Sequence, residues 1–135
     1  MTEEQIGLSR RVVGCKRWRW LPGMLDENRN RVLSVAYTSP HYASVSCAGG
    51  PVWHHYPLNL LPDLTDPATL GCLLALVREA WGNRHLWVES GLDPAMWTVV
   101  RYELGWACVN DEEPPPDIYG DTEAEVLVAA LEAAP

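Results

Sequence analysis

A nucleophile and two proton carriers lie close together in the middle of the sequence. Cys47 precedes the adjacent histidines His54 and His55, and Gly49-Gly50 lies between them. If the flanking segments pair as strands, Cys47 and one imidazole could act as nucleophile and base. The residues indicate no third orienting group and no oxyanion hole, so an inert, buried Cys47 is the favoured interpretation. A small hydrolase or ligand-binding protein using this region is the alternative.

The pattern does not favour a metal or cofactor site. Adjacent residues of a strand point to opposite faces, so His54 and His55 cannot hold one ion unaided. His41 and His85 lie elsewhere in the sequence and could approach His54 and His55 only if tertiary folding brought them together. The four cysteines lie far apart, without the short spacing of a structural zinc site, and no phosphate-binding glycine motif occurs. We predict no catalytic residues, no metal and no cofactor, and we expect that the chain is not an enzyme.

Charge is distributed unevenly along the chain, whose net charge is −8. Seven basic and two acidic residues lie from Arg10 to Arg31, whereas three basic and fourteen acidic residues lie from Val32 to Pro135. Such an acidic body repels a phosphate backbone, so general nucleic-acid binding is not expected, and a basic protein partner would be attracted.

Two segments are candidates for binding a partner. In "RWRW", tryptophans alternate with arginines, and these two residue types dominate interface hot spots. The alternative is a purely structural role, as an edge strand with its Trp side chains inside and its Arg side chains outside. The acidic third of the chain could occupy a basic groove, although a solvated face is its usual explanation. The predicted partner-binding residues are Arg17, Trp18, Arg19, Asp111, Glu112, Glu113 and Asp117.

The length of 135 residues, 47% of them hydrophobic, predicts a single domain over 1–135. No apolar run approaches the roughly 18 residues of a membrane span. The N-terminus lacks the apolar region of a secretory signal, so we expect a cytoplasmic protein with reduced thiols. Residues 1–9 are expected to be frayed or a short helical turn, and 110–120 an exposed, acidic, proline-rich loop.

Hydrophobic periodicity predicts an α+β fold, in which two helices pack on one antiparallel sheet. Strands are expected at 17–21 and 32–37, with a turn at Asp26–Asn30, and a second hairpin at 42–48 and 52–56, whose returning arm is an edge strand because of Pro51. A helix follows Asp66 and ends at Gly82. Two or three strands (85–90, 97–102 and 103–110) and a helix capped by Thr122 and Glu125 complete the order.

Three quoted segments, "WRWLPGM", "LPDLTDPATLGCLLALVREAWG" and "EAEVLVAALEAAP", resemble small proteins of tailed phages and prophages. In pattern, Thr65 to Ala134 is similar to the phage ABA sandwich domain, in which a helix, a small antiparallel sheet and a second helix stack in layers. This resemblance implies a phage accessory gene that acts in the bacterial host cytoplasm. It supplies no catalytic residues.

Together these observations predict an accessory protein that binds a host or phage protein. Its specific form would be inhibition of a host defence system, as by anti-CRISPR proteins. A virion or assembly component that forms homo-oligomers is a further alternative.

Overall fold

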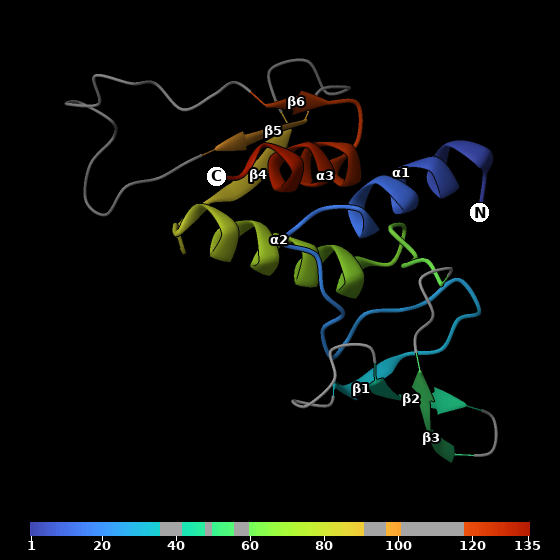
Figure 1. Ribbon diagram of the computed structural model, residues 1–135. Coiled ribbons are helices and arrows are strands. Elements are labelled where there is room, and N and C mark those ends of the chain that lie inside the picture. Colours follow the sequence, from blue (N-terminus) through green and yellow to red (C-terminus); the bar gives the residue numbers. More distant parts are fainter. Residues whose placement is uncertain (36–41, 48–49, 56–59, 91–96, 101–117) are drawn as a thin grey trace. The chain divides into compact units, whose positions relative to one another are not determined.

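The computed structural model describes residues 1–35, 42–47, 50–55, 60–90, 97–100 and 118–135 (Figure 1). The chain divides into two compact units, Met1–Cys72 and Leu73–Pro135. A single domain over 1–135 stays a prediction.

The first unit begins with helix α1 (Glu3–Val13). Its start is fixed by a capping box, in which the Gln5 amide donates to Thr2 Oγ1 at 3.2 Å and the Thr2 amide donates to Gln5 Oε1 at 2.8 Å. The inner face is anchored by Ser9, whose buried hydroxyl donates to the Pro62 carbonyl at 2.9 Å. A helix of 11 residues therefore lies where a frayed segment or a short helical turn was expected.

The turn predicted at 26–30 is present and is built around Asp26. Its Oδ1 accepts hydrogen bonds from the amides of Asn28 and Asn30, at 2.9 and 2.8 Å, and its own amide donates to the Asn30 carbonyl. Arg29 has a φ of 64°, in the left-handed region. The strand expected at 17–21 is absent, and the chain that leads into the turn makes two isolated bridges, Leu25 to Arg31 and Asp26 to Pro62.

The first sheet has the order β1-β2-β3, with β1 (Val32–Val35), β2 (Tyr42–Cys47) and β3 (Gly50–His55) all antiparallel. The predicted second hairpin is confirmed, because β2 and β3 pair from Cys47↔Gly50 to Tyr42↔His55. Pro51 lies on β3, at the edge of this sheet, as a residue without a backbone N–H requires.

Helix α2 (Pro67–Trp81) has the predicted start and end. Asp66 Oδ2 accepts from the Thr69 amide at 2.8 Å, and Gly82 has a φ of 62°. The amides of Gly82 and Asn83 donate to the carbonyls of Glu79 and Arg78, which is a Schellman motif. The buried stripe of this helix comprises Thr69, Leu73, Leu76, Val77 and Ala80.

The second unit contains β4 (Trp87–Ser90), β5 (Trp97–Val100), β6 (Tyr119–Gly120) and helix α3 (Glu123–Ala133). The order β4-β5-β6 is antiparallel, and α3 contacts all three strands (Figure 1). The predicted box of Thr122 and Glu125 caps α3. The expected strand at 103–110 lies outside the described residues, and β5 is bordered by β4 on one side and β6 on the other.

Two side chains of the C-terminal part of α2 form hydrogen bonds to backbone carbonyls of this unit. Trp81 Nε1 donates to the Ala130 carbonyl of α3 at 2.8 Å, and Arg78 Nε donates to the Leu86 carbonyl at 2.6 Å. The buried side chains of α3 are Val126, Leu127, Val128, Ala130 and Leu131. These contacts place the core of the second unit between α3 and its neighbours.

The predicted fold class, one antiparallel sheet with two helices packed on it, is wrong. The strands that the structure describes form two separate three-stranded sheets, in different units, and α1 adds a third helix. Periodicity locates strands but does not say which of them pair, because pairing is decided by contacts between distant segments.

Substitution of Gly120 provides a test of how closely α3 packs on β6. A Cβ at this position would lie 2.9 Å from Glu125 Cβ and from Val126 Cγ2. We expect Gly120→Ala to lower the free energy of unfolding by about 1–3 kcal/mol, because the added methyl group overpacks this contact. Urea denaturation followed by Trp fluorescence measures the change.

Gly71→Ala is the matched control, since a Cβ there meets nothing within 4 Å. Alanine is the better helix former, so this variant should gain about 0.5–1 kcal/mol. Equal stability changes in the two variants would refute the close packing at Gly120.

Candidate partner-binding surface

The turn that follows α1 carries three of the predicted partner-binding residues. Gly14 ends the helix, and its amide donates to the carbonyls of Arg10 and Arg11. The amides of Cys15 and Trp18 then donate to the carbonyls of Val12 and Cys15, at 3.0 and 3.1 Å, which forms two successive turns. Lys16, Arg17 and Arg19 are exposed, and Trp18 is half-buried. We call Lys16–Arg19 the basic turn.

The ring of Trp18 packs against the ring of Trp20. The two ring centroids are 5.6 Å apart and the planes meet at 72°, an edge-to-face contact of the kind that aromatic pairs prefer. Trp20 is only 6% exposed, so it belongs to the core, whereas Trp18 keeps part of its ring at the surface. Both tryptophans were expected to share one face of a strand; they do meet, but in an irregular segment.

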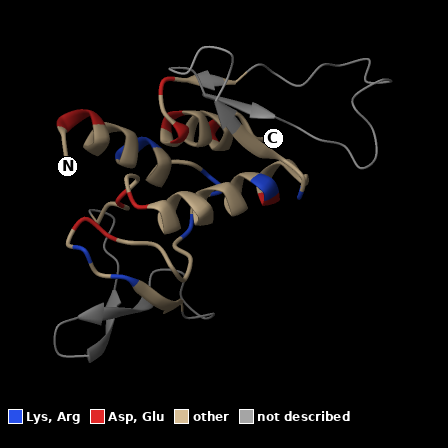
Figure 2. Cartoon of the chain, turned by 180° about the vertical axis from the view of Figure 1, so that it is seen from behind, with Lys and Arg blue, Asp and Glu red and all other residues tan. Residues whose placement is uncertain are grey.

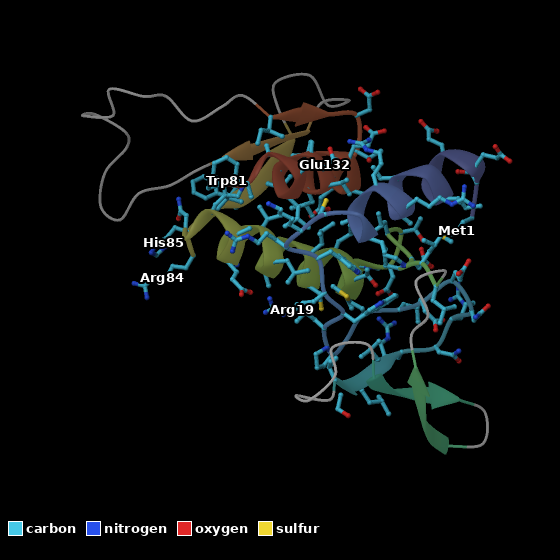
Figure 3. The ribbon with its side chains drawn as sticks, in the orientation of Figure 1. Met1, Arg19, Trp81, Arg84, His85 and Glu132 are labelled. Atoms are coloured by element: carbon cyan, nitrogen blue, oxygen red, sulfur yellow. The ribbon has the colours of Figure 1, made fainter. Side chains whose placement is uncertain are left out.

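Positive charge is concentrated around this turn. Five of the ten Lys and Arg residues of the chain lie within residues 10–19, and no acidic residue occurs between Glu4 and Asp26 in the sequence. All five are exposed. Figure 2 colours the Lys and Arg positions blue, and Arg19 is labelled in Figure 3. The half-buried Trp18 therefore lies in the sequence between two exposed arginines, within a stretch that is rich in positive charge.

The segment after the basic turn is held by an ion pair. Arg31 Nη1 and Nη2 donate to Asp66 Oδ2 and Oδ1, at 2.7 and 3.1 Å, and Nη1 also donates to the Gly23 carbonyl at 2.7 Å. The Thr69 hydroxyl donates to Asp66 Oδ2 and accepts from the Leu25 amide, both at 2.9 Å. One carboxylate thus joins the start of α2 to both sides of the loop at 23–31.

These contacts change the acidity of the groups involved. The hydrogen bonds from Arg31, assisted by those from Thr69, lower the pKa of Asp66 from 3.8 to about 2. The same pair raises the pKa of Arg31. Burial raises the pKa of the Cys72 thiol, whose Sγ donates to the Pro22 carbonyl at 3.5 Å. This thiol is therefore not activated as a nucleophile.

The register of the β2–β3 hairpin separates Cys47 from the two histidines. Cys47 pairs with Gly50, whereas His54 and His55 pair with Ala43 and Tyr42. Four residues of extended strand correspond to about 13 Å, so the backbone does not bring Cys47 and His54 within hydrogen-bonding reach. His85 lies before β4 in the second unit, where its Nε2 accepts from Arg84 Nε at 3.1 Å (Figure 3).

The predicted acidic partner-binding residues Asp111, Glu112, Glu113 and Asp117 lie outside the described residues, as does His41. Within the described part of the chain, no group of three or more His, Cys, Asp or Glu side chains is arranged to hold a metal ion. Among the described residues, none of the helices has both the length and the apolar character of a membrane span.

Comparisons of the chain with protein-family models, curated proteins and solved structures gave no match.

The Arg31–Asp66 pair was missed from the sequence. Asp66 was recognised as the cap of α2, but its partner is 35 residues away and nothing local marks it. The capping box of α1 had a local signal, the T-x-x-Q spacing of Thr2 and Gln5, which could have predicted that helix.

Replacement of Asp66 tests the role of the ion pair. We expect Asp66→Asn to lower the free energy of unfolding at pH 7 by about 1–3 kcal/mol, because the amide keeps the helix cap but loses the charged bonds to Arg31. Asp121→Asn, at an exposed position, should change it by less than about 0.5 kcal/mol.

The effect should depend on pH in one direction. The pKa of Asp66 is lower in the folded state than its ordinary 3.8, so the stabilisation is fully present above that value and is lost as the pH falls towards 2. In urea titrations at pH 7, 4 and 2.5, the difference in unfolding free energy between the wild type and Asp66→Asn should decrease as the pH falls. A difference in unfolding free energy that stays constant down to pH 2.5 would contradict the lowered pKa of Asp66.

Proposed function

We propose that this chain acts by binding another protein and that the basic turn forms part of the contact surface. The observation that carries the proposal is the half-buried Trp18, supported edge-to-face by the buried Trp20 and flanked by the exposed Arg17 and Arg19. Trp and Arg are the residues most enriched at binding hot spots. A supported ring loses little conformational freedom on binding, which favours affinity.

The chemistry of the turn defines the surface that it would bind. A cationic rim requires carboxylates on the partner, and the exposed part of the indole requires an apolar or aromatic side chain among them. An acidic protein surface with an apolar centre meets both needs. Charge complementarity of this kind accelerates association and makes it sensitive to salt.

The resemblance to small tailed-phage proteins supports a host or phage protein as the partner. Under this proposal the chain is a phage accessory protein, and inhibition of a host defence complex is the form to be tested first. The acidic residues Asp111, Glu112, Glu113 and Asp117 remain a second contact surface on the basis of charge alone. The alternative of a Cys47-dependent hydrolase is not favoured, because the hairpin register separates Cys47 from His54.

The basic turn can be tested with single charge reversals. A partner captured from bacterial lysate is purified, and its affinity for the chain is measured by titration calorimetry. We expect Arg17→Glu to weaken binding at least tenfold, about 1.4 kcal/mol, at low ionic strength and less at high ionic strength. Arg29→Glu changes the net charge equally at an exposed position outside the turn and should have little effect.

Equal losses for Arg17→Glu and Arg29→Glu would mean that only net charge matters, and the basic turn would not be the contact surface. Tight binding of a single-stranded oligonucleotide that is abolished by Arg17→Glu would overturn the proposal in favour of nucleic-acid recognition.

A further inference from the structure

Helix α1 presents one continuous exposed face. Counting its C-cap, the exposed positions follow the spacing of a single helical stripe, and the positions between them are half-buried or buried. The exposed residues are Glu3, Glu4, Gly7, Arg10, Arg11 and Gly14.

The charges on this face are arranged symmetrically about Gly7. Glu3 and Glu4 lie four and three residues before it, and Arg10 and Arg11 lie three and four residues after it. When the helix is followed from its other end, every acidic position is exchanged for a basic one. Figure 2 shows the two colours at opposite ends of α1. At a rise of 1.5 Å per residue, the acidic and basic pairs are about 10 Å apart.

This arrangement is complementary to itself. If a second copy of α1 crosses the first in antiparallel orientation at Gly7, Glu3 lies opposite Arg11 and Glu4 lies opposite Arg10. The two-fold axis repeats both pairs, as an isologous interface requires. A Cβ at position 7 would meet nothing within 4 Å, so the space over Gly7 is open to an approaching backbone.

The helix macrodipole alone favours acids in the first turn and bases in the last. It does not account for glycine at the centre of the stripe, since glycine weakens the interior of an exposed helix. Gly71 of α2 is also exposed and open, but no acidic residue lies in the first turn of that helix. The combination of central glycine and opposed charges belongs to α1.

We propose that α1 mediates weak, antiparallel self-association of this chain, with a second copy as the occupant of its exposed face. The association is transient and sensitive to salt, because exposed ion pairs contribute little each and are screened. This proposal does not depend on the basic turn or on the proposed function.

Complementary charge reversals provide the test. Glu3→Arg/Glu4→Arg makes the face wholly basic, and Arg10→Glu/Arg11→Glu makes it wholly acidic. Sedimentation velocity at about 0.01 M ionic strength should show concentration-dependent dimers for the wild type and at least tenfold weaker association for each variant alone. An equimolar mixture of the two variants should form heterodimers. Glu4→Arg and Arg10→Glu, used singly, repeat the design if a double variant fails to fold.

Two further variants locate the contact. Gly7→Gln should weaken association at least tenfold because its side chain occupies the crossing point, whereas Gly71→Gln should not. Arg17→Glu should leave association unchanged, which separates this surface from the basic turn. A wild type that is monomeric at millimolar concentration, or folded variants that fail to associate when mixed, would overturn the proposal. Unchanged association of Gly7→Gln would overturn the crossing at Gly7.

Discussion

Much of the first unit depends on the ion pair between Arg31 and Asp66. The Asp66 carboxylate caps α2 and accepts two hydrogen bonds from the guanidinium, while the same guanidinium holds the Gly23 carbonyl. Thr69 extends the network to the Leu25 amide. The Asp66 side chain is only 13% exposed, so each bond forms in partial exclusion of water, where an unpaired charge would be costly. Loss of either partner would disturb three chain segments together.

This network explains how an irregular segment can present a defined surface. The chain between α1 and Val32 has no strand until β1, yet it is fixed at Trp20 by burial and at Gly23 by Arg31. Exposed loops on rigid supports are the usual location of binding residues, because the support removes part of the ordering cost. The basic turn lies between two such supports, the C-terminal end of α1 and the Trp20 contact.

The sequence was informative at most places where structure is specified locally, although the local capping box of α1 was not recognised. Asp66, Gly82 and the Thr122–Glu125 box each act within a few residues of the helix end that they define, and α2 and α3 were predicted from them. The β2–β3 hairpin was also predicted, since its two arms are adjacent in the chain. Sheet partners and the Arg31–Asp66 pair depend on tertiary packing, which periodicity does not encode. For the candidate surface, residue types suggested Arg17, Trp18 and Arg19, but not the turn that displays them.

The left-handed conformation of Arg29 limits the stability of this loop. A side chain other than Gly, Asn or Asp pays about 1–2 kcal/mol in that region, and here the bonds around Asp26 hold the backbone in place regardless. Asn30, one position later, is a residue type that would have met the requirement at position 29. The turn therefore contains a reserve of stability that a single substitution to glycine or asparagine at position 29 would reach.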